Sequence, residues 1–273
     1  MSADQPLDAG KVRAFAIDLD GTLMTSDDTL TPRAMAAVGA ALEAGIDIIL
    51  ATARWYQNAE RVARPLGLTR AVIACSGAEV RRLSDGADLM DLRLPLDFAA
   101  DLYEILDGER SLAWIPMDDV VLMRAEGSFD LELDELRHVP SLAGAADVAP
   151  RMALIQGTAV CQSVLDALEP RWRDQVQFLT SITHYGKTLL TLTAAGADKG
   201  VALRVACEDH GIDPGEVVAI GDSDNDLAMF SVAGASIAMG QAEEAVKGQA
   251  DVVTGANTED GAAEAIEKYI LPR

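Results

Sequence analysis

The fold of this 273-residue chain is decided by residues 15–23, which read FAIDLDGTL. A short apolar run ends there in two carboxylates, Asp18 and Asp20, and Gly21 follows at once. The alternation of the run predicts a strand, and the glycine predicts a sharp turn after it. A buried strand would therefore carry both carboxylates at its carboxyl end, where open α/β sheets bind their ligands.

Two carboxylates at one strand end repel each other unless a positive charge lies nearby. Mg²⁺ is the usual partner because it prefers oxygen ligands, and beside it one carboxylate could attack an electrophile while the other transfers a proton. For Asp-x-Asp-Gly alone, a polar turn that ends a strand is an equally open interpretation, since Asp and Gly are common in turns. A calcium-binding loop is disfavoured because Leu23 stands where that loop needs glycine.

A second acidic cluster follows another β-rich run, at residues 217–220. It occupies residues 221–226, which read GDSDND. The start of a capped helix would explain one of these residues, because Asp and Asn are good N-caps, but three acids within five positions exceed that need. If this strand neighbours the first one, the two sets of carboxylates converge on one Mg²⁺.

Two further polar residues lie at ends of predicted elements. Thr52 follows a predicted strand at residues 46–50, and its hydroxyl could donate to a phosphoryl oxygen, although alone it is typical of a helix cap. Lys199 lies at a predicted helix start, where a cation opposes the helix dipole. Alone it is typical of a solvated surface lysine, whereas an anionic ligand would explain its position better.

Strands and helices alternate in the first and last thirds of the chain, which predicts parallel strands joined by right-handed crossovers. In the middle third this alternation gives way to hairpin signals and predicted antiparallel strands. We therefore predict an α/β fold, with a Rossmann-like parallel-sheet core at residues 1–88 and 187–273. An inserted α+β domain is predicted at residues 89–186.

The charge of the chain restricts its partners. With 44 acidic and 22 basic residues, the formal net charge is −22. Nucleic acid and anionic membranes are not expected partners, because both need clustered Lys and Arg. A small anionic substrate would need local positive charge, from a metal or from a few placed basic residues.

The cysteines and the apolar stretches indicate a location. The three cysteines are widely spaced and form no Cys-x-x-Cys, which is typical of buried thiols in a reducing compartment. No signal-peptide pattern and no apolar stretch of membrane-spanning length is visible in the sequence. We expect a cytoplasmic protein that is a monomer or a small homo-oligomer.

Taken in order, the signals are Asp-x-Asp-Gly-Thr at residues 18–22, Thr52, Lys199, and Gly-Asp-x-x-Asn-Asp at residues 221–226. With this set the chain resembles the haloacid dehalogenase superfamily of phosphotransferases, whose four motifs all have a match. The insertion resembles the α/β cap of the Cof-type, sugar-phosphatase-like branch. The resemblance implies a Mg²⁺-dependent phosphatase that hydrolyses small phosphorylated metabolites, such as sugar phosphates or phosphorylated cofactors, through an aspartyl-phosphate.

The resemblance also implies roles for individual residues. Asp18 would be the nucleophile. Asp20 would protonate the leaving oxygen and then activate the hydrolytic water. The phosphoryl oxygens would be held by Thr52, Lys199 and Asn225.

The same resemblance implies a metal site. Mg²⁺ would be bound by Asp18, by the backbone carbonyl of Asp20 and by Asp222. Asp226 would support either the metal or Lys199.

Two positions depart from the family pattern. Ala53 stands where the family usually has glycine, and Ser76 stands where it often has asparagine. Neither change removes a catalytic group, but both lie near the expected meeting place of cap and substrate, so they leave the substrate preference open. Arg54 could equally reach the substrate or lie at the surface. Candidates for substrate contacts in the insertion are Trp114, Met117, Asp118, Asp119, His184 and Tyr185.

Two other functions fit the same motifs. A phosphomutase of the superfamily would return the phosphoryl group to substrate instead of water. A non-catalytic sensor of a phosphorylated ligand, or a receiver that is itself phosphorylated, would need neither the acid–base carboxylate Asp20 nor, for a receiver, the inserted domain.

Overall fold

The structure is a computed structural model, and it describes residues 8–125, 133–183 and 186–270. The chain forms two compact units, residues 1–90 with 198–273 and residues 91–197. The second boundary differs from the predicted one at residue 187. The β-rich residues after that position form β11 (Thr188–Ala194), which pairs with strands of the second unit and therefore belongs to it.

The first unit is built on an eight-stranded sheet in the order β14-β13-β12-β1-β2-β3-β4-β5. The pairs from β14 to β3 are parallel, and β4 joins β3 antiparallel. This arrangement confirms the predicted α/β core with a parallel sheet. The strands are β1 (Ala14–Ile17), β2 (Asp47–Ala51), β3 (Ala71–Ala74), β4 (Glu79–Arg82), β5 (Asp88–Asp91), β12 (Val217–Gly221), β13 (Ala235–Ala238) and β14 (Val252–Val253).

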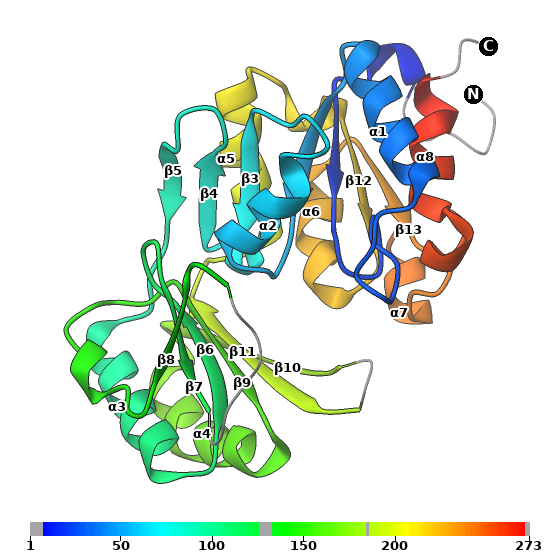
Figure 1. The fold of residues 1–273 in the computed structure, drawn as a ribbon. Coiled ribbons are helices and arrows are strands. Elements are labelled where there is room, and N and C mark those ends of the chain that lie inside the picture. The colour runs from blue at the N-terminus through cyan, green and yellow to red at the C-terminus, as the bar shows by residue number, and fades with distance from the viewer. Residues whose placement is uncertain (1–7, 126–132, 184–185, 271–273) are drawn as a thin grey trace. The chain divides into compact units, whose positions relative to one another are not determined.

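Strand β1 shows why helices cover both faces of this sheet. Its side chains alternate, so that Phe15 and Ile17 enter one apolar cluster while Ala14 and Ala16 enter another on the opposite face. Helices α1, α2 and α8 pack on the first face, and α5, α6 and α7 pack on the second (Figure 1). Their bounds are α1 (Pro32–Glu43), α2 (Tyr56–Ala63), α5 (Lys199–His210), α6 (Leu227–Val232), α7 (Glu244–Lys247) and α8 (Gly261–Ile270).

The second unit is an α+β domain, as predicted for the insertion. Its six-stranded sheet has the order β10-β11-β9-β6-β7-β8, and helices α3 (Leu96–Gly108) and α4 (Thr158–Trp172) share one apolar cluster with it. All its pairs are antiparallel except β7 with β8. The other strands are β6 (Leu112–Pro116), β7 (Val121–Arg124), β8 (Leu136–Val139), β9 (Met152–Gln156) and β10 (Val176–Ile182). Among the described residues, no helix has the length and apolarity needed to cross a membrane.

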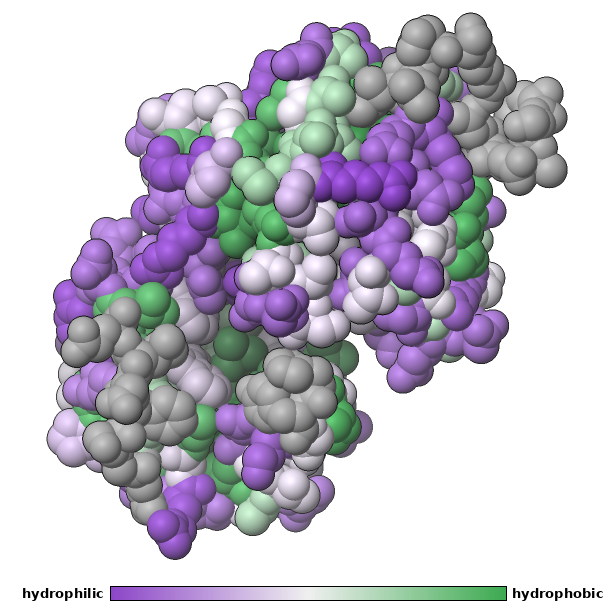
Figure 2. All heavy atoms as spheres, turned by 45° about the vertical axis from the view of Figure 1, so that its right-hand side comes forward, coloured by the Kyte–Doolittle hydropathy of each residue, from purple (hydrophilic) through white to green (hydrophobic). Residues whose placement is uncertain are grey.

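Hydrophilic side chains cover much of each unit on the face that Figure 2 shows. This surface agrees with an acidic chain whose net charge is −22. The large apolar side chains that are exposed among the described residues are spread over several elements, and single exposed apolar residues are normal on soluble domains. They are Met35, Leu96, Leu179, Ile182, Val201 and Val253.

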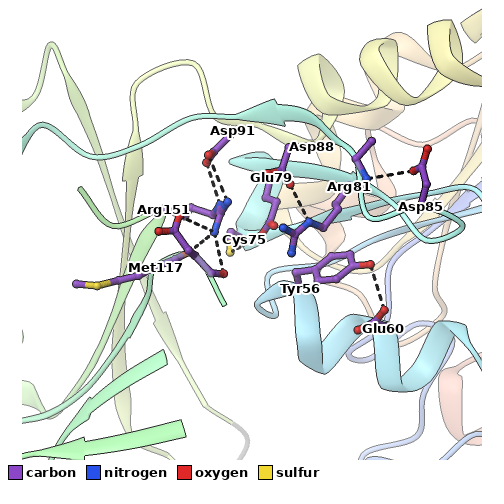
Figure 3. A network of polar contacts seen from close by, with 12 residues as sticks. Tyr56, Glu60, Cys75, Glu79, Arg81, Asp85, Asp88, Asp91, Met117 and Arg151 are labelled. Atoms are coloured by element: carbon purple, nitrogen blue, oxygen red, sulfur yellow. Dashed lines mark hydrogen bonds and ion pairs between the residues drawn. The ribbon is translucent and has the colours of Figure 1, made fainter. Parts of the chain in front are cut away.

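In each unit, an arginine side chain joins neighbouring elements through polar contacts. In the first unit, Arg81 pairs with Asp88 at 2.8 Å and lies over the ring of Tyr56, which ties β4 to β5 and to α2 (Figure 3). In the second unit, the buried Arg151 binds Asp91, so the start of that unit is held to β9 (Figure 3). A buried guanidinium needs such partners, because an unpaired buried charge is strongly destabilising.

A buried histidine, His210, lies at the amino ends of β2 and β3. The Ala71 N–H donates to His210 Nε2 at 3.2 Å, and His210 Nδ1 lies 3.2 Å from Asp47 Oδ2. Because Nε2 accepts a hydrogen bond, the ring proton is on Nδ1 and the imidazole is neutral. Burial lowers the pKa of His210 below its ordinary value, although the nearby Asp47 opposes this shift and Arg70 adds to it.

We expect His210 to make the core more stable at neutral than at mildly acidic pH. Its folded-state pKa lies below the unfolded one, so its contribution is present above an unfolded pKa of about 6.5 and is lost as pH falls through the folded value. In urea unfolding at pH 7.5, His210→Gln should be about 1 kcal/mol less stable than the wild type, because a hydrogen bond is lost or weakened. The difference should shrink at pH 5.5, and an equal difference at both pH values would contradict this account.

Candidate active site

Parallel strands deliver the predicted site residues to one edge of the core sheet. Asp18 follows β1 directly, and its N–H donates to Ile220 O of β12 at 3.0 Å. Thr52 follows β2, and its N–H donates to Ile73 O of β3 at 2.9 Å. Each residue thus continues the hydrogen bonding of its strand, which fixes where its side chain begins.

A buried lysine joins the first and the last motif. Lys199 is the first residue of α5, and its side chain is fully buried. Its Nζ lies 2.6 Å from Asp18 Oδ1 and 2.7 Å from Asp226 Oδ1. Lys199 is therefore not the solvated surface lysine that its position alone would allow.

Burial and the neighbouring charges shift the pKa values of Asp18, Asp222 and Lys199. Burial raises the pKa of Asp18 well above its ordinary value, although Lys199 opposes the shift. Burial opposes the charge of Lys199, but Asp18 and Asp226 together raise the pKa of Lys199. Burial and the neighbouring Asp226 raise the pKa of Asp222 to about 6. The carboxylates outnumber the lysine, so the cluster favours a further positive charge.

The three carboxylates form a compact group that suits a metal ion. One oxygen from each of Asp18, Asp222 and Asp226 lies within 4.8 Å of the others. Asp226 is already occupied, because its Oδ1 accepts from Lys199 and its Oδ2 accepts from the N–H groups of Asp222 (2.9 Å) and Ser223 (3.0 Å). Asp18 and Asp222 are left as the better placed pair, and oxygen donors of this kind fit a hard cation such as Mg²⁺.

Gly21 allows Asp222 to lie against the first motif. A Cβ atom at Gly21 would be 2.3 Å from Asp222 Oδ2, and the φ angle of +84° is one that side chains rarely adopt. Thr22 Oγ1 donates to Asp222 Oδ1 at 3.3 Å. The glycine and threonine of Asp-x-Asp-Gly-Thr therefore position the carboxylate of the last motif.

The side chain of Asp20 lies outside this group. Half of it is exposed, and Arg54 binds it with two nitrogens, Nε at 2.9 Å and Nη2 at 2.5 Å. Arg54 also bonds Asp28, and only 14% of its side chain is exposed. Arg54 is thus a partner of the predicted acid–base residue, and the sequence had left its position open between substrate and surface.

The two remaining predicted phosphate ligands, Thr52 and Asn225, each retain a hydrogen-bond donor that could bind a phosphoryl oxygen. Thr52 is fully buried, and its Oγ1 accepts the Arg54 N–H at 3.1 Å, so its own O–H can donate elsewhere. Asn225 is half-buried and uses its Oδ1 to accept from Ser223 Oγ at 2.9 Å. The group that Asn225 can offer to a phosphoryl oxygen is therefore its amide NH₂.

Sequence reasoning missed Gln241. Its Nε2 donates to Gly21 O at 2.6 Å, and its Oε1 accepts the Asn257 N–H at 2.9 Å, so it fastens the first motif to a later loop. The signal was available, because Gln241 follows the end of β13 at the same sheet edge. Of the candidates in the inserted domain, His184 and Tyr185 lie outside the described residues.

Comparison with known proteins identifies relatives over nearly the whole chain. The family model described as haloacid dehalogenase-like hydrolase matches residues 15–266. Pyridoxal phosphate phosphatase YbhA of Escherichia coli is 27% identical and aligns over 95% of this chain and 99% of its own length. The 5-amino-6-(5-phospho-D-ribitylamino)uracil phosphatase YcsE of Bacillus subtilis is 26% identical, over 95% and 96% respectively. The crystal structure of a haloacid dehalogenase-like hydrolase from Bacteroides thetaiotaomicron superposes with a TM-score of 0.83 at 28% identity, covering 94% of this chain and 99% of that one.

Proposed function

Because this chain belongs to the haloacid dehalogenase-like hydrolase family, we propose that its acidic site hydrolyses phosphomonoesters with Mg²⁺ and through an aspartyl-phosphate. Its place in the family and its named relatives make it a phosphoric monoester hydrolase acting on small phosphorylated metabolites. The observation that carries the finer proposal is the contact of Lys199 with Asp18 and Asp226. This contact supports the proposal, because it sets a positive charge beside a buried carboxylate at the edge where open α/β sheets generally bind their ligands.

In the proposed reaction, Asp18 supplies the electron pair. An Oδ atom of Asp18 forms a bond to phosphorus while the bond from phosphorus to the leaving alkoxide breaks, and Asp20 gives that alkoxide its proton. Asp20 then takes a proton from water as the water attacks phosphorus and releases Asp18. Phosphoryl transfer depends on position and charge neutralisation, which are the roles proposed for Thr52 and Lys199.

The proposed metal site uses Asp18, Asp222 and the backbone carbonyl of Asp20. When bound, Mg²⁺ supplies positive charge for the phosphoryl oxygens, which an acidic protein with a net charge of −22 otherwise offers from few places. Asp226 keeps Lys199 and the loop that carries Asp222 in position.

For the substrate, we propose a phosphomonoester of a sugar or of a cofactor-like alcohol. The two named relatives are phosphatases of pyridoxal phosphate and of a phosphorylated ribitylaminouracil, both of which are small phosphomonoesters. A cytoplasmic location, the absence of nucleic-acid and membrane partners, and a monomer or small homo-oligomer stay predictions from the sequence. The phosphomutase and sensor alternatives are separated from hydrolysis by the following experiment.

Metal removal should abolish phosphate release. Purified protein is given a panel of phosphorylated sugars, nucleotides and cofactors, and inorganic phosphate is measured with Mg²⁺, with chelator, and after Mg²⁺ is restored. We expect release from at least one member, a fall of roughly 100-fold or more with chelator, and full recovery, since the metal neutralises transition-state charge. Phosphate release that is insensitive to chelator would refute the proposed dependence on Mg²⁺. Binding of phosphorylated ligands without release would favour the mutase or the sensor.

A further inference from the structure

The turn that follows β3 has an unusual backbone. Its three residues, Cys75, Ser76 and Gly77, have φ angles of +50°, +55° and +93°. Only glycine adopts such angles readily, so two of the three residues are strained. Strain of this kind persists where the surroundings enforce it, and it is concentrated at functional sites.

One side of this turn is bonded to the loop that carries Thr52. The Ser76 N–H donates to Thr52 O at 3.0 Å, and the Cys75 N–H donates to Arg54 O at 2.8 Å. Ser76 is thereby held directly beside a proposed phosphate ligand and close to the partner of Asp20.

The other side of the turn touches the start of α5. A Cβ atom at Gly77 would lie 2.4 Å from the carbonyl carbon and oxygen of Asp198 and 2.8 Å from the backbone nitrogen of Lys199. No side chain fits there, so the backbone of the turn lies against the residue that carries the buried ammonium. The turn therefore lies between the backbone segments of the two proposed phosphate ligands, Thr52 and Lys199.

The side chain of Ser76 ends in a hydroxyl that the described residues leave without a hydrogen-bond partner. Its Oγ is shielded from water. A buried hydroxyl without a partner is unfavourable, and such groups need an explanation. The side chain of the neighbouring Cys75 lies against Glu79, with its Sγ 3.9 Å from Oε2 (Figure 3).

We propose that Ser76 is a further substrate-binding residue of this site, whose hydroxyl donates a hydrogen bond to an oxygen of the bound phosphomonoester. The proposal rests on the proposed function, since it takes Thr52 and Lys199 as the phosphate ligands between which Ser76 is held. The proposal also explains the strained turn, because the strained conformation holds the backbone of Ser76 in a position that a relaxed turn would not give it. Under this proposal, the presence of serine where the family often has asparagine affects substrate binding.

Three variants separate the hydroxyl from the backbone. Ser76→Ala removes the hydroxyl and keeps the strain, whereas Ser76→Gly removes the hydroxyl and relieves the strain. Ser76→Asn keeps a donor in a residue that tolerates left-handed backbone, and it serves as the conservative control. For each protein, we would measure kcat and KM for the best substrate, the affinity for inorganic phosphate with Mg²⁺ by calorimetry, and the unfolding temperature.

We expect Ser76→Ala and Ser76→Gly to lower kcat/KM by roughly 10- to 100-fold, as loss of a hydrogen bond to a charged group does. Ser76→Gly should do so while unfolding at the same or a higher temperature, which a merely structural role would not produce. Ser76→Asn should recover most of the activity. Weaker phosphate binding would place the contact on a phosphoryl oxygen, and unchanged phosphate binding with altered kcat/KM would place it on the leaving group.

Activity and phosphate affinity within twofold of the wild type in both Ser76→Ala and Ser76→Gly would overturn the role of Ser76 and leave the proposed function intact. A wild type that binds phosphate without hydrolysing any substrate would overturn the proposed function, and the calorimetric comparison would still test Ser76. A wild type that neither binds nor hydrolyses would overturn both.

Discussion

Asp18→Asn should lose phosphatase activity by a factor of roughly 10⁴ or more, because Asp18 is the proposed covalent nucleophile. In the absence of metal, the same variant should unfold at a higher temperature than the wild type. An amide has no charged oxygen to attack phosphorus. The gain in stability follows from the raised pKa of Asp18, which burial causes. A carboxyl group whose folded-state pKa exceeds its unfolded value stabilises the fold only at low pH, and that contribution is lost as pH rises through the folded value. Asn has no proton to release, so at neutral pH the variant avoids the loss of stability that the buried Asp18 carboxyl causes as pH rises.

Measuring activity and thermal stability together distinguishes loss of the proposed nucleophile from damage to the fold. Phosphate release is measured with Mg²⁺, and thermal unfolding is measured with chelator at pH 7.5 for the wild type, Asp18→Asn and Asp18→Glu. Asp18→Glu keeps the charge and moves it, so it should be inactive without the gain in stability. A fully active Asp18→Asn would place the nucleophile elsewhere, and an inactive but less stable one would show that its inactivity reflects damage to the fold.

The positions of the carboxylates could be predicted because they depend on local pattern. Asp18 and Asp222 each follow a short apolar run, and parallel strands end at a common edge whatever their order. Their closeness then required only that β1 and β12 be neighbours, which they are. Which strands are neighbours depends on the whole sheet. From the sequence, the closeness of Asp18 and Asp222 could therefore be predicted only on the condition that β1 and β12 are neighbours.

The features that escaped prediction depend on distant partners. Residues 188–194 are β-rich in either unit, and only their pairing with β9 and β10 assigns them to the second. The burial of Lys199 depends on carboxylates 181 and 27 positions away in the sequence. The hold of Arg54 on Asp20 likewise joins two loops, and neither loop alone indicates it.

Lys199→Met should cause a large loss of stability as well as of activity. Methionine matches the length of lysine, but it leaves Asp18 and Asp226 buried without the ammonium that both contact at less than 3 Å. Removing one partner of a buried ion pair costs about 3–5 kcal/mol, because the remaining charge is unpaired. The loss of phosphate release should reach roughly 100- to 1000-fold, as removal of a donor to developing charge does.

A second substitution tests whether the unpaired carboxylates are the cause. Asp226→Asn removes one of them, while the oxygen of the introduced amide can still accept the N–H groups of Asp222 and Ser223 that Asp226 Oδ2 accepts now. The NH₂ of that amide can in addition donate toward the Asp18 carboxylate. The double variant Lys199→Met with Asp226→Asn should therefore be more stable in urea unfolding than Lys199→Met alone, so the two effects should be non-additive. Additive losses would mean that Lys199 stabilises α5 by packing rather than by charge. Activity should stay lost in the double variant in either case, since the positive charge beside Asp18 is gone, and this separates what the ammonium does for the fold from what it does for the reaction.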